Sequence, residues 1–259
     1  MKRGADMITK AKIEENLNSL GISLPVVFYE ETDSTNTRAK EFAKAHPESR
    51  ENMLFVANAQ TRGRGRMGRS FVSNEGAGIY MSLLTYPSER GFDATRATAK
   101  AAVAICRAID ELYGTRTEIK WVNDVYLGGK KLAGILCEGE VGQSGEIGYL
   151  IIGMGINVYK NAISDEISTI ATSIESETNI TPERSVITAK IAKEVLGLNA
   201  SDFEEYKKRS LVIGRMVRVI KASEQYDAKV LDLNDDYSLT LERGDKTERL
   251  FTGEVSLKI

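Results

Sequence analysis

Histidine is nearly absent from this sequence of 259 residues, which contains only His46, next to Pro47 in a polar stretch. A Ser-His-Asp triad and a metal site with several histidines are therefore excluded. The two cysteines, Cys106 and Cys137, lack C-x-x-C spacing, and residues 1–9 lack the apolar core of a signal peptide. No run of about 18 apolar residues is present. We expect a cytoplasmic protein that does not enter a membrane.

A strong charge of either sign is also missing. The 35 lysines and arginines are balanced by 37 acidic residues, for a net charge of -2. The broad positive field that nucleic acid or an anionic membrane attracts is therefore absent, and recognition of anions must be local. Too few residues precede the first functional-looking segment for a helix-turn-helix. We expect no specific DNA binding.

Hydrophobic spacing predicts a mixed α/β domain over residues 1–213. Thr9 is expected to cap a helix that ends at Gly21, and residues 118–126 and 131–138 are expected to form a hairpin around Gly128. The other expected elements are strands at 26–30, 53–59, 78–86 and 147–159, and helices ending near Ala45, spanning 93–113, and starting near Pro182 and Ser201.

The pattern changes at Gly214. Short alternating strands are expected at 216–221, 228–233, 238–242, 249–252 and 254–259, separated by polar turns. Strands of this length and number are typical of a small all-β barrel of SH3-like size. The sequence therefore predicts an α+β fold of two domains, 1–213 and 214–259, with the boundary near Ile213.

The loop at residues 60–71 contains four arginines and no acidic residue. Its glycines let the backbone approach a ligand closely, and guanidinium groups pair bidentately with carboxylates or phosphates. Residues 63–68 match the dinucleotide pattern G-x-G-x-x-G, but a strand is expected to follow, and the acidic partner of a ribose is missing. A small-anion site, a nucleic-acid contact and a solvated basic loop remain open.

A second polar segment, at residues 118–124, places Lys120, Asn123 and Asp124 at a strand end. A lysine can neutralise phosphate, an amide can read a base edge and a carboxylate can hold magnesium, although an ordinary Asn-Asp turn needs no ligand. Strand alternation puts Lys131 on the same face as two apolar residues, where it needs an anionic partner if that face is buried. Two outward lysines, Lys130 and Lys131, are the alternative.

Six segments occur in the order found in biotin protein ligases, and the sequence is similar to the short form that lacks the DNA-binding repressor domain. The segments are 32–36, 60–71, 120–124, 131–136, 153–158 and 253–257. This resemblance implies a catalytic domain like that of class II aminoacyl-tRNA synthetases, followed by an SH3-like barrel. It also implies ATP and magnesium as cofactors and biotin as the substrate.

The resemblance also assigns roles to residues. Lys131 and Arg66 match catalytic positions, and Asp124 matches a possible magnesium contact. The residues that match biotin contacts are Ser34, Thr35, Asn36, Gln60, Arg64, Gly65, Arg66, Lys131 and Gly134. Those that match ATP or adenylate contacts are Arg64, Arg69, Phe71, Lys120, Asn123 and Asn157.

Two positions depart from the family pattern: Val122 replaces a common proline, and Phe71 replaces a tryptophan. Valine lacks the fixed φ of proline, and phenylalanine offers a smaller face for stacking on adenine. The implied reaction activates biotin as an adenylate and passes it to a lysine of a biotin carboxyl carrier protein. A homodimer is a family expectation. A lipoate-protein ligase and a nucleic-acid-binding module are the alternatives.

Overall fold

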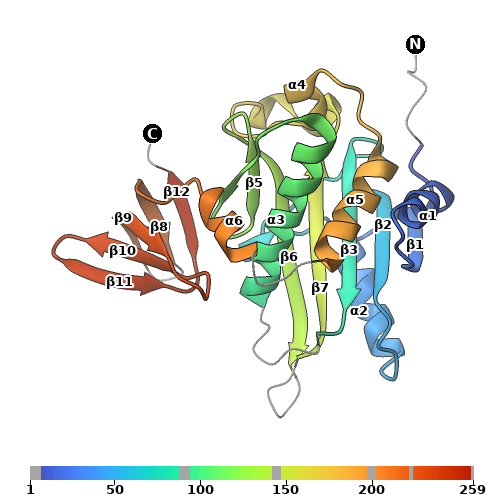
Figure 1. The fold of residues 1–259 in the computed structure, drawn as a ribbon, viewed down its shortest axis with the longest axis horizontal. Coiled ribbons are helices and arrows are strands. Elements are labelled where there is room, and N and C mark those ends of the chain that lie inside the picture. The colour runs from blue at the N-terminus through green and yellow to red at the C-terminus, as the bar shows by residue number, and fades with distance from the viewer. Residues whose placement is uncertain (1–6, 88–93, 142–146, 198–201, 222–223, 258–259) are drawn as a thin grey trace.

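The computed structural model describes residues 7–87, 94–141, 147–197, 202–221 and 224–257. The larger part forms a seven-stranded sheet in the order β1-β2-β3-β7-β6-β5-β4, in which β1 and β2 are parallel and the other neighbours antiparallel (Figure 1). These strands are β1 (Val26–Thr32), β2 (Met53–Gln60), β3 (Gly78–Thr85), β4 (Glu118–Lys120), β5 (Asp124–Leu127), β6 (Lys130–Val141) and β7 (Ile147–Asn157).

Helices cover both faces of this sheet. They are α1 (Lys10–Ser19), α2 (Thr35–Ala45), α3 (Ala94–Tyr113), α4 (Ile174–Thr178), α5 (Arg184–Leu196) and α6 (Asp202–Lys208), with short 3₁₀ turns at Arg66–Gly68, Lys160–Ala162 and Asp165–Ile167. The buried residues of α1, α3 and α5 share one core with Leu54 and Val56, whereas α2 packs with Phe55 and Leu84. Neighbouring residues of β2 therefore enter different cores, because side chains alternate across a strand.

The predicted helix ends are confirmed where the structure describes them. The Thr9 hydroxyl caps α1 by accepting from the Lys12 amide at 3.3 Å, and Gly21 follows the helix with a φ of +72°. Gly114, with a φ of +64°, directly follows α3, the longest described helix. The expected helix starts at 93 and 201 lie outside the described residues.

One strand prediction needs correction. The strand expected at 78–86 is present as β3, and its residues from Gly78 to Leu84 are all buried between the two helix layers. The expected hairpin around Gly128 is formed by β5 and β6, but the single strand expected at 118–126 is wrong. It is split into β4 and β5 by a turn in which Trp121 and Val122 are buried and joined by a cis peptide. The Trp121 indole donates to the Tyr237 carbonyl at 2.7 Å, so its side chain is anchored to the turn between the C-terminal strands at Gln225–Leu233 and Leu239–Arg243.

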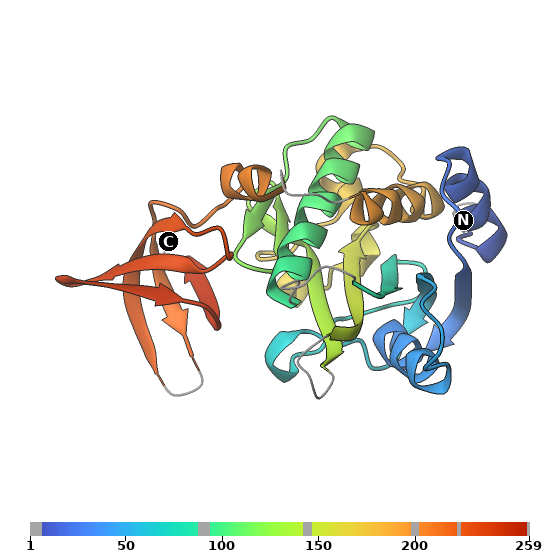
Figure 2. The same ribbon diagram turned by 60° about the horizontal axis from the view of Figure 1, so that its bottom comes forward.

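The C-terminal strands form a separate antiparallel sheet in the order β11-β10-β9-β8-β12, which lies at one end of the molecule (Figures 1 and 2). They are β8 (Met216–Ile220), β9 (Gln225–Leu233), β10 (Leu239–Arg243), β11 (Lys246–Leu250) and β12 (Glu254–Leu257). The five expected strands are present, although residues 258 and 259 lie outside the described chain. Pairing of β11 with β12, which would close a barrel, is not found among the described residues. The structure therefore supports an open sheet.

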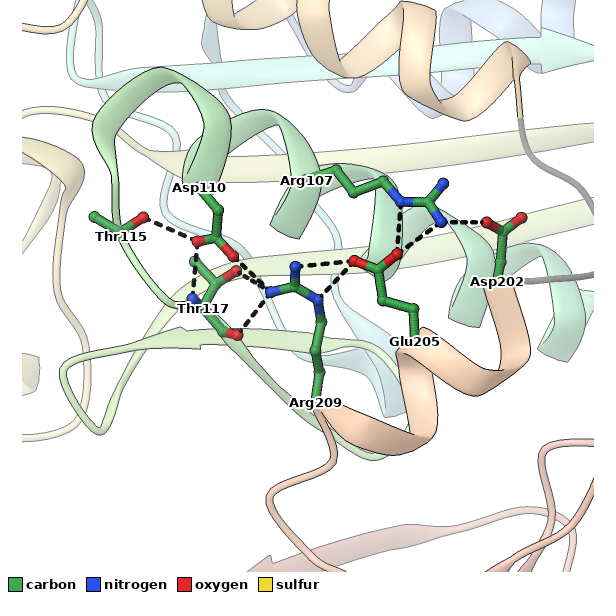
Figure 3. A network of polar contacts seen from close by, with 7 residues as sticks. All are labelled: Arg107, Asp110, Thr115, Thr117, Asp202, Glu205 and Arg209. Atoms are coloured by element: carbon green, nitrogen blue, oxygen red, sulfur yellow. Dashed lines mark hydrogen bonds and ion pairs between the residues drawn. The ribbon is translucent and has the colours of Figure 1, made fainter.

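A polar network fastens the chain between the two sheets (Figure 3). Arg209, just after α6, donates to Asp110 at 2.6 Å, to Glu205 at 2.9 Å and to the Thr117 carbonyl at 3.1 Å. Arg107 on α3 donates to the same Glu205 at 2.7 Å. Backbone hydrogen bonds of 2.8 Å on both sides of Ile119 then hold the segment after α6 beside β4. Within the described ranges, no helix combines the length and apolar character that crossing a bilayer requires.

Candidate active site

A pocket of about 880 Å³, counted out to its open mouth, lies where the arginine loop folds over the ends of β4, β5, β6 and β7. The start of α2 and the end of β2 form another part of its wall. The pocket is thus lined by segments from strands across almost the whole width of the larger sheet.

All residues predicted for the site except Asn157 line this pocket. They are Ser34, Thr35, Asn36, Gln60, Arg64, Gly65, Arg66, Arg69, Phe71, Lys120, Asn123, Asp124, Lys131 and Gly134. Asn157 is buried at the end of β7, paired with Gly78, and is not part of the pocket lining. Its assignment to adenine stays a prediction.

One wall consists of neutral polar groups at the start of α2. The Gln60 amide oxygen accepts from the Thr35 backbone N–H at 2.8 Å, and the Gln60 amide nitrogen donates to Ser73 at 2.9 Å. Ser82 lies within 2.7 Å of the Thr35 hydroxyl and 2.6 Å of the Asn36 amide oxygen. Thr35 and Asn36 are almost fully buried, so their orientations are fixed before a ligand enters.

The arginine loop lines one side of the pocket and is fastened at three points. Arg66 donates to the Asn123 amide oxygen at 3.1 Å and to the Gly253 carbonyl at 3.2 Å. Arg69 makes a bidentate pair with Glu254 at 2.7 and 2.8 Å, and these hydrogen bonds raise the pKa of its guanidinium. Arg64 pairs with Glu138 on β6. Arg64 and Arg69 are exposed, so their ion pairs contribute little to stability.

Lys131 reaches into the pocket, but the face expected from strand alternation is wrong. A bulge in β6 after Lys131 puts its side chain on the same face as Gly134, whereas Ala133 and Ile135 lie in the core. Its Nζ lies 2.8 Å from the Asp124 carboxylate on β5, and the side chain is 34% exposed. Lys130, its neighbour, instead donates to the Ser168 carbonyl at 2.7 Å, away from the pocket lining. The two lysines of this strand therefore have different surroundings, and the pocket holds one of them.

Phe71 covers the backbone of β7. A Cβ added to Gly155 would lie 2.6 Å from the Phe71 ring, so the glycine allows the ring to lie directly against the strand. The ring also makes an edge contact with Tyr80, with 6.4 Å between centroids. Phe71 therefore presents a fixed aromatic surface to the pocket, which is a platform suited to stacking.

Residues 28–157 match the Biotin/lipoate A/B protein ligase family. The chain is 30% identical to the bifunctional ligase/repressor BirA of Bacillus subtilis (strain 168) over 99% of its own length and 83% of that protein. The chain belongs to this family.

Other members of the ligase family are similar to it in sequence and in structure. The biotin–[acetyl-CoA-carboxylase] ligase of Mycobacterium tuberculosis is 28% identical, over 79% of each chain. The biotin protein ligase from Aquifex aeolicus, solved in complex with biotin and ATP, superimposes with a TM-score of 0.72 at 26% identity. This superposition covers 90% of the present chain and 98% of the Aquifex chain.

Several pocket contacts of this ligase-family chain were not predicted from its sequence. Ser82 lies in an apolar strand, and a buried hydroxyl there signals a hydrogen-bond partner, but not which one. Glu138 and Glu254 carry the opposite charge to the loop arginines that they hold, yet they are distant in sequence. Gly155 belongs to one of the six motifs, without an assigned role.

The described residues of the pocket offer few ligands for a metal ion. Within the described ranges, no group of three or more His, Cys, Asp or Glu side chains lies together. Asp124 and Glu254 are the carboxylates of the pocket lining, and both pair with cations. This donor set fits magnesium held by one carboxylate and by substrate phosphates, which is how Mg²⁺ is commonly bound at nucleotide sites.

Proposed function

We propose that this protein is an ATP-dependent biotin protein ligase, which forms biotinyl-5'-AMP and transfers the biotinyl group to a lysine of a biotin carboxyl carrier protein. The main support for this proposal is that the chain belongs to this family and has one pocket that combines a neutral hydrogen-bonding wall with a cationic end. Thr35, Asn36 and Gln60 suit the uncharged ring of biotin, whereas Arg66 and Lys131 suit its carboxylate and the phosphates of ATP.

The first step is attack of a biotin carboxylate oxygen on the α-phosphorus of ATP, which forms the mixed anhydride and releases pyrophosphate. Lys131 and Arg66 neutralise the negative charge that gathers on the phosphate oxygens in the transition state. Their side chains are held by Asp124 and Asn123 before the substrates meet, so little reorganisation is required. Asp124, together with the substrate phosphates, would hold magnesium, which would supply further neutralisation of charge.

In the second step, the uncharged amine of a carrier lysine attacks the anhydride carbonyl. The carbon–oxygen bond to phosphate breaks, AMP leaves, and the attacking nitrogen loses a proton to form the amide. The anhydride must be protected from water until then. The loop supports this role, because its contacts with Glu138, Asn123 and Glu254 place it over the pocket.

We also propose two domains, 1–213 and 214–259, of which the second is related to an SH3-like barrel. Expression of residues 1–213 alone tests whether the first domain folds without the second. Support for a boundary near Ile213 comes from the change from the mixed sheet to the antiparallel sheet on either side of it. The contacts of Gly253 and Glu254 with the arginine loop make the second domain a brace for the pocket.

The proposed partner is a biotin carboxyl carrier protein in the cytoplasm, with a homodimer as the proposed assembly and without specific DNA binding. Three of the loop arginines are engaged with groups of the chain itself, which argues against a free cationic surface for nucleic acid. Mobility shift at moderate salt tests the DNA prediction, and a sequence-specific complex of nanomolar affinity would overturn it. Sedimentation tests the dimer.

The function is tested by incubating the protein with ATP, magnesium and a purified biotin carrier domain, with either biotin or lipoate as the acid. We expect the carrier to gain the mass of one biotinyl group, and its lysine-to-arginine variant to gain none. Transfer of lipoate in preference to biotin would instead support the alternative ligase. No transfer of either acid would contradict the proposal.

A further inference from the structure

Glu138 is the one acidic residue of β6 that contacts both the neutral wall of the pocket and the arginine loop, among the residues that the structure describes. Its Oε2 accepts from the Asn36 side-chain amide at 2.8 Å and also pairs with Arg64. The side chain is 28% exposed. It lies beside Arg64 in the second hollow under the loop and is not among the lining residues of the main pocket.

The carboxylate determines how Asn36 is oriented. An ionised carboxylate can only accept hydrogen bonds, so Asn36 must turn its NH₂ group toward Glu138. The Leu136 carbonyl, 3.3 Å from the same nitrogen, is a longer and weaker acceptor that favours the same orientation. The Asn36 amide oxygen is then left to face Ser82, whose hydroxyl is 2.6 Å away.

This orientation determines the direction of the next hydrogen bonds. A serine hydroxyl has one proton, and Ser82 donates it to the Asn36 oxygen, because an amide oxygen can only accept. The Ser82 oxygen, 2.7 Å from the Thr35 hydroxyl, therefore accepts from Thr35. Gln60 is a more distant acceptor for the same proton, at 3.2 Å. The proton of the Thr35 hydroxyl is then committed within the wall, so toward a ligand in the pocket this oxygen can only accept.

We propose that Glu138 is a positioning residue that sets the direction of the chain Glu138–Asn36–Ser82–Thr35 and so makes Thr35 an acceptor for an N–H group of the substrate. The inference rests on the proposed function, because biotin carries N–H groups in its ureido ring. Glu138 acts without touching the ligand. Its effect reaches the pocket through three hydrogen bonds whose order is fixed by donor and acceptor chemistry.

The test measures biotin affinity by calorimetry and the KM for ATP in four single variants and one double variant. Glu138→Ala removes the acceptor and Ser82→Ala interrupts the chain while leaving the Arg64 pair intact. Glu138→Gln keeps an oxygen that can accept from Asn36. Glu140→Gln is the matched control, because Glu140 is an exposed carboxylate on the same strand.

We expect Glu138→Ala and Ser82→Ala each to weaken biotin binding about tenfold, with Glu138→Gln within about threefold and Glu140→Gln unchanged. The KM for ATP should change less than the biotin Kd. The double variant Glu138→Ala, Ser82→Ala should bind about as weakly as either single variant, because both interrupt one chain.

Four results would overturn the inference. These are wild-type affinity in Ser82→Ala, wild-type affinity in a folded Glu138→Ala, additive losses in the double variant, and an equal rise in the KM for ATP, which would indicate a general structural role. If Glu138→Ala fails to fold, Ser82→Ala still decides the matter. Absence of biotin binding by the wild-type protein would instead contradict the proposed function itself.

Discussion

Replacement of Lys131 by alanine is the substitution whose effect on adenylate formation follows most directly from the geometry. Its ammonium group lies 2.8 Å from Asp124 and projects into the pocket. Two unit charges about 4 Å apart interact by about 4 kcal/mol at an effective dielectric constant of about 20. Because one third of the side chain is exposed, screening reduces this value. A barrier increase of about 2.7 kcal/mol, or a rate loss on the order of 100-fold, is therefore expected.

The assay is biotin-dependent exchange of labelled pyrophosphate into ATP by purified variants. Lys131→Met serves as a second variant, because it keeps most of the apolar stem and loses the charge. Lys130→Ala is the matched control and should stay within a few fold, since Lys130 contacts the Ser168 carbonyl outside the pocket. Near-wild-type exchange by a folded Lys131 variant would remove this residue from the mechanism. A large loss in Lys130→Ala would show that the wrong lysine was assigned.

Three further results are expected. Saturating biotin and ATP should slow tryptic cleavage of the arginine loop, and Glu254→Gln should speed it because Arg69 loses its carboxylate partner; equal cleavage rates in all samples would refute a role of the loop in covering the pocket. Gly155→Val should raise the KM for ATP several fold, since its side chain displaces the Phe71 ring; unchanged kinetics would show that the ring position is unimportant. Arg209→Ala should lower the free energy of unfolding in urea by about 2 kcal/mol, because a network of partly buried charges loses its centre. A loss below about 0.5 kcal/mol would contradict this.

The arginine loop was predictable because its signal is local: four arginines without an acidic neighbour indicate an anion site. The face of Lys131 was not predictable from the period-two pattern of a strand, because a bulge in β6 after this residue shifts the alternation. The turn at Trp121 was not predictable from local signals either. It depends on an indole hydrogen bond to Tyr237, 116 residues further along the chain.

The contacts that orient the pocket are also distant in sequence. Glu138 is 102 residues from Asn36, and Ser82 is 46 residues from the same side chain. A single sequence shows that such polar residues need partners, but not which partners the fold supplies. Closure of the C-terminal sheet likewise depends on how strands curve and meet, which alternation of side chains does not specify.

Formation of biotinyl-AMP inside this pocket is the central claim, and native mass spectrometry tests it most directly. The protein is incubated with biotin, ATP and magnesium without a carrier, and the mass of the intact complex is measured. We expect one biotinyl-AMP bound per chain, dependent on both substrates and strongly reduced in Lys131→Ala. A complex that contains ATP alone, or lipoyl-AMP in preference to biotinyl-AMP when both acids are present, would contradict the claim.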